Sequence, residues 1–161
     1  MEELTKNGSE NELQHHGILG MKWGVRRYQN EDGSLTAAGK KRYNTMQDAS
    51  SYARQKGDFW KNSYEDAKKD MKEYEDKYSG EEGLKRYKKD MFDDDELTDE
   101  DARQAIKADM KWLKEDAQSM NSLAKDWYSK ADAFQNYTVD NIPSKLYNEG
   151  KKYAKQWQKG R

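Results

Sequence analysis

The chain has 161 residues, which suits a single domain, and 33% of them are hydrophobic while 38% are charged. Thirty basic and 31 acidic side chains leave a net charge of −1, which excludes a generic polybasic nucleic-acid binder. Cysteine is absent, so disulfides, a thiolate nucleophile and a cysteine-based zinc site are excluded as well. Aromatic residues reach 12%, more than a disordered chain carries, and we expect thin helical layers held together by aromatic and methionine side chains.

The first part of the chain changes character at residue 15. Residues 1–14 are polar and predict a mobile tail, without the basic and apolar regions of a signal peptide. Residues 15–35 alternate glycines with apolar side chains, and three glycines within eight residues argue against a stable isolated helix. We interpret this stretch as a compact segment that rests Ile18 and Trp23 on another surface, with a turn at residues 30–33.

Three rows of uncharged residues, spaced alternately by three and four positions, predict amphipathic helices. These helices cover about 37–78, 99–136 and 144–159, and a shorter helix is expected over 84–92. The rows, called seams below, comprise Tyr43, Met46, Ser50, Ala53, Gly57, Trp60, Tyr64, Ala67, Met71, Tyr74 and Tyr78 in the first helix; Ile106, Met110, Leu113, Ala117, Met120, Ala124, Trp127, Ala131 and Phe134 in the second; and Leu146, Gly150, Tyr153 and Trp157 in the third. Thr36, Thr98 and Ser144 are the expected N-caps.

These helices predict an all-α fold over residues 36–161. We expect an elongated bundle in which the two long helices pair antiparallel and the helices 84–92 and 144–159 fill the groove between them. Each helix is apolar on a narrow stripe only, so none is stable alone. An open helical hairpin that completes its core by forming a homo-oligomer, or by docking on a partner, is the alternative interpretation. No apolar run approaches the roughly 20 residues that a membrane span needs.

Residues for catalysis or metal binding are scarce. His15 and His16 are the two histidines, and adjacent imidazoles supply too few ligands for a metal site that needs three or four. No glycine-rich loop followed by Lys-Ser or Lys-Thr is present to hold a phosphate, and no nucleophile–base pair can be named. We therefore expect no enzymatic activity, no metal and no cofactor.

Residues 90–101 contain eight acidic side chains and no basic one. They are Asp90, Asp93, Asp94, Asp95, Glu96, Asp99, Glu100 and Asp101. A divalent-cation site is one interpretation, although the spacing of a calcium loop is missing. A surface that mimics nucleic-acid phosphates, centred on residues 90–96, is the second. The third is a solvated linker, in which Asp99–Asp101 stabilise the first turn of the next helix.

Residues 15–43, HHGILGMKWGVRRYQNEDGSLTAAGKKRY, form the most distinctive motif. They resemble a segment that recurs in proteins encoded by tailed phages and prophages of Gram-positive bacteria, often from genes for head and head–tail morphogenesis. There the segment is joined to otherwise unrelated, usually helical, sequences. The matching positions include His15, His16, Gly17, Gly20, Trp23, Gly24, Arg26, Arg27, Asp32, Gly33, Leu35, Thr36, Gly39, Lys40 and Tyr43. No family is recognised in residues 44–161.

A short module shared among different helical proteins implies a docking tag. The expected contact residues are His15, His16, Ile18, Met21, Trp23, Arg26, Arg27 and Tyr28. The apolar side chains would anchor the segment, the glycines permit close approach, and the arginines can pair with carboxylates or backbone of a partner. The alternative is that the segment packs on the chain's own bundle.

The resemblance implies a non-enzymatic phage protein of the virion or of its assembly: a minor head component, a scaffold-like protein or an internal protein addressed to the capsid. Its partners would be phage structural proteins, its location the virion or the host cytoplasm, and direct nucleic-acid binding is not expected. A phage-encoded inhibitor of a host defence nuclease, similar in action to an anti-CRISPR protein, is the alternative. It would bind the host protein through Asp90, Asp93, Asp94, Asp95 and Glu96.

Overall fold

The structure, a computed structural model, describes residues 27–92 and 97–160, and 82% of these residues are helical. Four helices follow in chain order: α1 (Ala37–Tyr78), α2 (Gly80–Met91), α3 (Asp99–Gln135) and α4 (Ser144–Lys159). The described residues contain no strand; an isolated antiparallel bridge pairs Gln29 with Leu35. The predicted all-α fold is confirmed.

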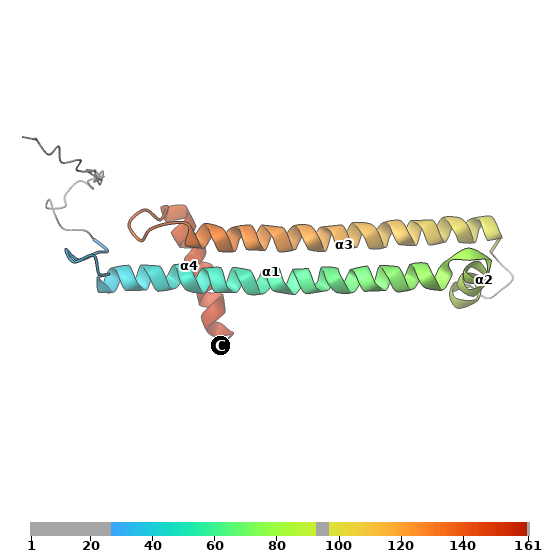
Figure 1. Cartoon of the computed structure of the whole chain (residues 1–161), viewed down its shortest axis with the longest axis horizontal. Helices are drawn as coiled ribbons and strands as arrows, with labels where there is room; N and C mark the ends of the chain where they lie inside the picture. The colour runs from blue at the N-terminus through green and yellow to red at the C-terminus, as the bar shows by residue number, and fades with distance from the viewer. Residues whose placement is uncertain (1–26, 93–96, 161) are drawn as a thin grey trace, which may run out of the picture.

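The two long helices form an antiparallel hairpin. α1 has 42 residues, which corresponds to a length of about 63 Å, and α3 lies beside it along most of that length (Figure 1). The predicted seams face each other, since of all their residues in α1 and α3 Tyr43 alone is exposed. Burial of these narrow stripes is what holds the pair together, because neither helix carries an apolar face wide enough to be stable alone.

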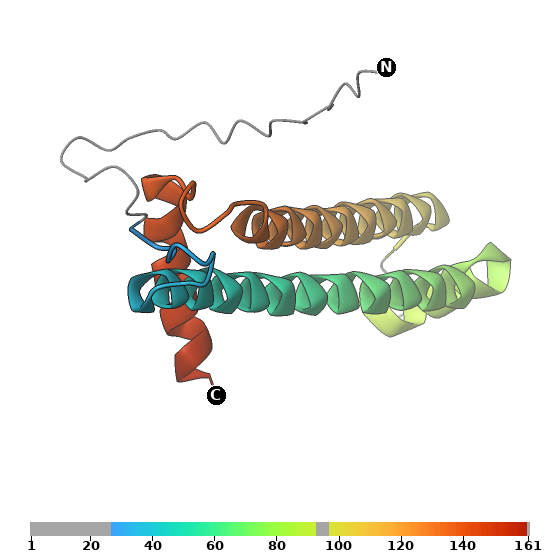
Figure 2. The same ribbon diagram turned by 60° about the vertical axis from the view of Figure 1, so that its left-hand side comes forward.

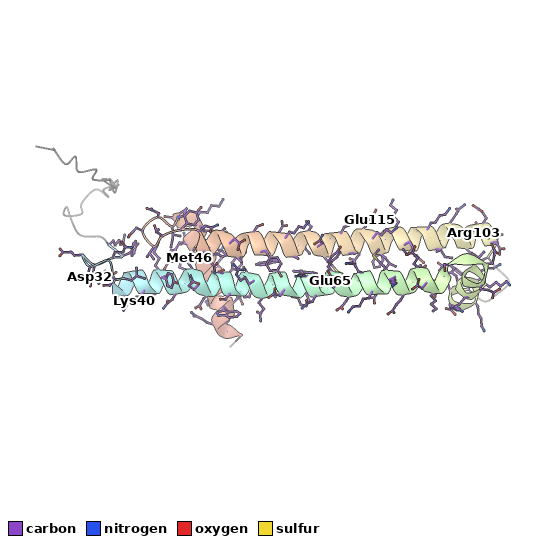
Figure 3. The ribbon with its side chains drawn as sticks, in the orientation of Figure 1. Asp32, Lys40, Met46, Glu65, Arg103 and Glu115 are labelled. Atoms are coloured by element: carbon purple, nitrogen blue, oxygen red, sulfur yellow. The ribbon has the colours of Figure 1, made fainter. Side chains whose placement is uncertain are left out.

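The two short helices cover the two ends of this hairpin. α4 crosses α1 near the N-terminal end of α1 instead of running along it, and α2 lies at the opposite end (Figures 1 and 2). Figure 3 labels Met46 near the crossing, Arg103 beside α2, and Glu65 and Glu115 in the long stretch between. We expected the short helices to fill the groove between the two long helices. They cover it at its two ends only.

Small side chains build the core at the α4 end, which we call the proximal core. Its buried members are Met46, Ala49, Ala53, Ala131, Phe134 and Ile142. A Cβ atom at Gly150 of α4 would lie 3.0 Å from the sulfur of Met46, so glycine allows α4 to approach α1 closely. The buried Ser50 hydroxyl donates a hydrogen bond of 2.9 Å to the Ala131 carbonyl across the hairpin. Three helices thus meet here at short range.

Tyrosines build the core at the other end, which we call the distal core. Tyr78, Leu84, Tyr87 and Ala102 are its buried members. α2 begins at Gly80, so the predicted start at residue 84 is wrong. Gly80 has φ +69°, a conformation that glycine adopts without strain, and it turns the chain into a new helix after a single intervening residue.

The helix starts at Thr36 and Thr98 agree with the sequence. The Thr36 hydroxyl accepts the Gly39 N–H at 3.1 Å, and the Thr98 hydroxyl accepts the Asp101 N–H at 3.2 Å. The predicted cap at Ser144 is wrong, because Pro143 is the N-cap and its carbonyl accepts the Tyr147 N–H at 2.9 Å. No helix within 27–92 and 97–160 is long and apolar enough to cross a membrane.

Candidate docking segment and acidic surface

Some of the predicted docking residues lie within the described part of the chain and the others lie outside it. Arg27 and Tyr28 are described. The others lie outside the described residues: His15, His16, Ile18, Met21, Trp23 and Arg26. The structure therefore shows how residues 27–36 join the bundle.

A tight turn carries the end of the segment into α1. The Asn30 N–H donates to the Ser34 carbonyl at 2.7 Å, and Gly33 takes φ +83° as the turn requires. The Asp32 carboxylate accepts the Ser34 N–H at 2.9 Å, and hydrogen bonds from the Ser34 side chain and backbone lower the pKa of Asp32. The turn lies where the sequence predicts it, at residues 30–33.

Tyr28 is fixed to the first turn of α1. Its carbonyl accepts the Thr36 N–H at 3.0 Å, and its backbone lies so close to Gly39 that no side chain fits at that position. The Thr36 hydroxyl also donates to the Arg27 carbonyl at 3.2 Å. Arg27 is exposed, and its guanidinium lies 5.5 Å from the centroid of the Tyr28 ring.

Arg42 of α1 ties this turn to the far end of the chain. Its guanidinium lies 5.0 Å from the Tyr28 ring centroid and 4.2 Å from that of Tyr147 in α4. Its Nε and Nη2 donate to the carbonyls of Val139 and Ile142 at 3.0 and 2.7 Å. The sequence analysis missed Arg42, because its partners lie about 100 positions away and no local pattern marks them.

These contacts make residues 28–43 part of the proximal end of the bundle. The segment is thus anchored at its C-terminal side, through backbone hydrogen bonds and the Arg42 contacts. Arg27, the first described residue, therefore lies at this end of the hairpin.

The first and last parts of the acidic run hold α2 in place. Asp90 accepts a 2.7 Å ion pair from Lys77 and a 3.1 Å hydrogen bond from the Tyr78 hydroxyl, which lower its pKa. Asp99 accepts a 3.0 Å ion pair from Lys88, which lowers its pKa as well. Both lysines come from outside the run, so the pairing of Asp90 and Asp99 is not visible in the run itself.

The other described acidic residues of the run, Glu100 and Asp101, form hydrogen bonds in the first turn of α3. The Thr98 hydroxyl donates to the Asp101 carboxylate at 2.6 Å, and Glu100 accepts a hydrogen bond from Gln104. Negative charge in this first turn is favourable. Asp93, Asp94, Asp95 and Glu96 lie outside the described residues. Across the described part of the chain, no group of three or more His, Cys, Asp or Glu side chains is arranged to hold a metal ion.

A polar cluster that the sequence analysis missed lies in the distal core. The half-buried Asp109 carboxylate accepts hydrogen bonds from the hydroxyls of Tyr74 at 2.6 Å and Tyr87 at 2.9 Å. Burial, reinforced by Asp109, raises the pKa of both tyrosines. Both phenols therefore stay protonated at neutral pH and act as hydrogen-bond donors to Asp109. Asp109 was missed because it lies beside the α3 seam and not on it.

Comparison with known proteins concerns the N-terminal segment alone. Residues 6–30 are similar to a family of unknown function (DUF7211). No curated protein and no solved structure matches the chain. The family match includes residues 15–30 of the predicted docking segment and ends before α1 begins. The match therefore covers part of the N-terminal segment and none of the hairpin.

Proposed function

We propose that this is a non-enzymatic phage protein of the virion or of virion assembly, in which residues 15–28 dock on a phage structural protein. The hairpin, about 63 Å long, then serves as a rigid spacer or scaffold element. The resemblance of residues 15–43 supports the phage context. The family match over residues 6–30 overlaps this segment and assigns it no function.

The anchoring of Tyr28 is the observation that carries this proposal. Its backbone is bonded to Thr36 and packed on Gly39, while Arg42 lies against its ring. A docking segment anchored next to its contact residues loses less conformational freedom on binding than a free tail would. Trp23 lies five positions before Tyr28, a chain length that spans at most about 18 Å when fully extended.

The test is a double substitution, Trp23→Ala with Arg26→Ala. Virions produced with this variant should contain little of it, whereas virions with the unchanged protein contain stoichiometric amounts by mass spectrometry. The melting temperature should stay nearly constant, because neither residue is assigned to the hairpin core. A matched control is Tyr137→Ala with Arg86→Ala, which removes an exposed aromatic ring and an exposed arginine elsewhere.

Two outcomes would contradict the proposal. Absence of the unchanged protein from purified virions and from assembly intermediates would remove the virion role. A large drop in melting temperature on the double substitution would indicate that the segment packs on its own bundle instead of on a partner.

The nuclease-inhibitor alternative has less support. Asp90 pairs with Lys77 and Asp99 pairs with Lys88, so fewer carboxylates are left to mimic phosphates. Replacing Asp93, Asp94 and Asp95 with asparagine tests it. Mimicry predicts weaker, strongly salt-dependent binding to a basic nuclease groove, and a linker predicts no change.

A further inference from the structure

The hairpin has two unlike sides between its covered ends. α4 and α2 lie on the same side of it: Tyr52 of α1 stacks on Tyr153 of α4 with centroids 5.6 Å apart, and Asp109 of α3 accepts the hydroxyl of Tyr87 in α2. On the opposite side α1 and α3 contact each other directly. There the Tyr128 hydroxyl donates to Asp58 at 2.6 Å. Residues about seven positions apart on these helices share a side.

The side that bears α2 and α4, called the open face below, is acidic and aromatic between them. Over residues 56–73 and 112–126 it carries five carboxylates and one lysine. Its members are Lys56, Phe59, Ser63, Asp66, Asp70, Glu73, Trp112, Asp116, Ser119, Leu123 and Asp126. The side chains of Phe59 and Trp112 are 58% and 64% exposed, although both are large and apolar. Each ring offers apolar area that the aliphatic stems of long side chains on a partner can cover.

The opposite side, called the basic face below, has the reverse charge. Over residues 56–73 and 107–126 it carries seven lysines, all exposed, and two carboxylates. The lysines are Lys61, Lys68, Lys72, Lys107, Lys111, Lys114 and Lys125, and the carboxylates are Asp58 and Glu65. One hairpin thus displays two surfaces of opposite charge, back to back.

The open face has room for a second hairpin. Tyr52, where α4 packs, and Tyr74, at the level of α2, are 22 positions apart, a rise of about 33 Å along α1. About 5 Å at each end is taken by the radius of the covering helix, which leaves a gap of roughly 20 Å. Two helices side by side are about 20 Å wide. The hairpin therefore fits crosswise between its own covering helices.

We propose that the open face of one copy binds the basic face of a second copy, with the two hairpins crossing. The lysines of one copy then meet the carboxylates of the other, and their aliphatic stems and ammonium groups cover Phe59 and Trp112. Because the two surfaces differ, each contact leaves an open face and a basic face unused, so copies add in open-ended rows. A patch of this size belongs to the small interfaces, so association depends on protein concentration.

A second copy explains more of the surface than a nucleic acid does. A polyanion would use the lysines of the basic face and would leave the exposed rings and carboxylates of the open face without a role. The proposal is independent of the docking segment, since residues 15–28 belong to neither face. Loss of virion incorporation and loss of self-association are therefore separate results.

The test uses the full chain and two variants that each remove one face. The basic-face variant is Lys61→Glu, Lys72→Glu and Lys125→Glu; the open-face variant is Phe59→Ser, Trp112→Ser and Asp70→Asn.

Sedimentation at about 100 μM protein and about 50 mM salt should give the unchanged protein an average mass at least twice the 18.9 kDa of one chain. This average mass should fall toward that of one chain at about 500 mM salt. Each variant alone should stay at one chain. Mixed together they should form a 1:1 pair, because one intact open face meets one intact basic face.

The controls separate this proposal from other arrangements. Lys40→Glu, Lys41→Glu and Lys89→Glu change the net charge as much as the basic-face variant but lie on neither face, and this control should still associate. Circular dichroism shows that each variant is folded. A basic-face variant that still dimerises would indicate pairing between like faces and would overturn the proposal. An unchanged protein that stays at one chain would also overturn the proposal, whether or not its lysines bind duplex DNA.

Discussion

The proximal end and the middle of the hairpin use the same seam and bury it to different depths. At the proximal end the seam residues Met46 and Ala53 are buried, because α4 packs over them as a third helix. In the middle, Trp60 and Tyr64 continue the seam but are half-buried, and Phe59 beside them is exposed. Heptad spacing therefore tells which side of a helix faces inward, while the depth of burial depends on whether another helix covers the pair.

The largest expected effect comes from opening the proximal core. Phe134→Ala removes a buried ring that contacts Tyr153 of α4, and we expect a loss of about 3–5 kcal/mol in the free energy of unfolding. Trp112→Ala in the middle should change it by less than about 0.5 kcal/mol, because that ring is exposed. Urea denaturation at low protein concentration measures both values. Similar losses would show that the middle is as well packed as the end.

The next effect comes from Arg42. Arg42→Ala removes two hydrogen bonds to backbone carbonyls and leaves those carbonyls partly buried, and we expect a loss of about 1.5–3 kcal/mol. Arg42→Lys should restore little of it, because an ammonium group cannot reach both carbonyls in the same geometry. Thermal unfolding measures the loss. Full rescue by lysine would contradict the geometry described for Arg42.

A smaller effect distinguishes the distal core. Tyr74→Phe and Tyr87→Phe each remove one hydrogen bond to Asp109, and each should cost about 1 kcal/mol. The raised pKa of these tyrosines means that their contribution is complete below the ordinary tyrosine pKa of 10.0 and is lost as the pH rises above it. The unchanged protein should therefore lose stability above pH 10.0 more steeply than the double phenylalanine variant. Parallel stability curves would contradict this.

The smallest effect concerns the exposed ion pair at Asp90. Its lowered pKa means that its contribution is present above the ordinary value of 3.8 and is lost as the pH falls below that value. Asp90→Asn should lower the melting temperature slightly at neutral pH and have no effect in strong acid. Glu82→Gln is a matched control, since its pair with Lys85 lies within α2 and joins no other helix. A larger effect of the control would argue against Asp90 as a tie between α1 and α2.

Much of the fold was predictable because local spacing determines it. The bounds of α1 and α4, the N-caps Thr36 and Thr98 and the antiparallel pair all follow from the seams and from capping residues. The start of α2 was not predictable from local spacing, since Gly80 can either end a helix or turn the chain into the next one. The exposure of Trp112 depends on α2 and α4 leaving the middle uncovered, which no local pattern shows.

The candidate site was predictable to a smaller extent. The turn at residues 30–33 and the sequence resemblance point to the segment that ends at Tyr28. The contacts of Arg42 join residues about 100 positions apart, so they required the folded structure. The pairing of Asp90 with Lys77 likewise depends on how α2 folds back on α1. Short-range chemistry is visible in the sequence, and contacts between distant helices are not.

Hydrogen exchange along α1 tests most directly the claim that the hairpin is closed at its ends and open in its middle. At a protein concentration too low for self-association, amide protons of residues 46–57 should exchange at least about tenfold more slowly than those of residues 60–72, because local opening requires less energy where no third helix packs. Raising the concentration should slow exchange in residues 60–72 and leave residues 46–57 unchanged. Uniform protection along the whole of α1 at low concentration would contradict the account.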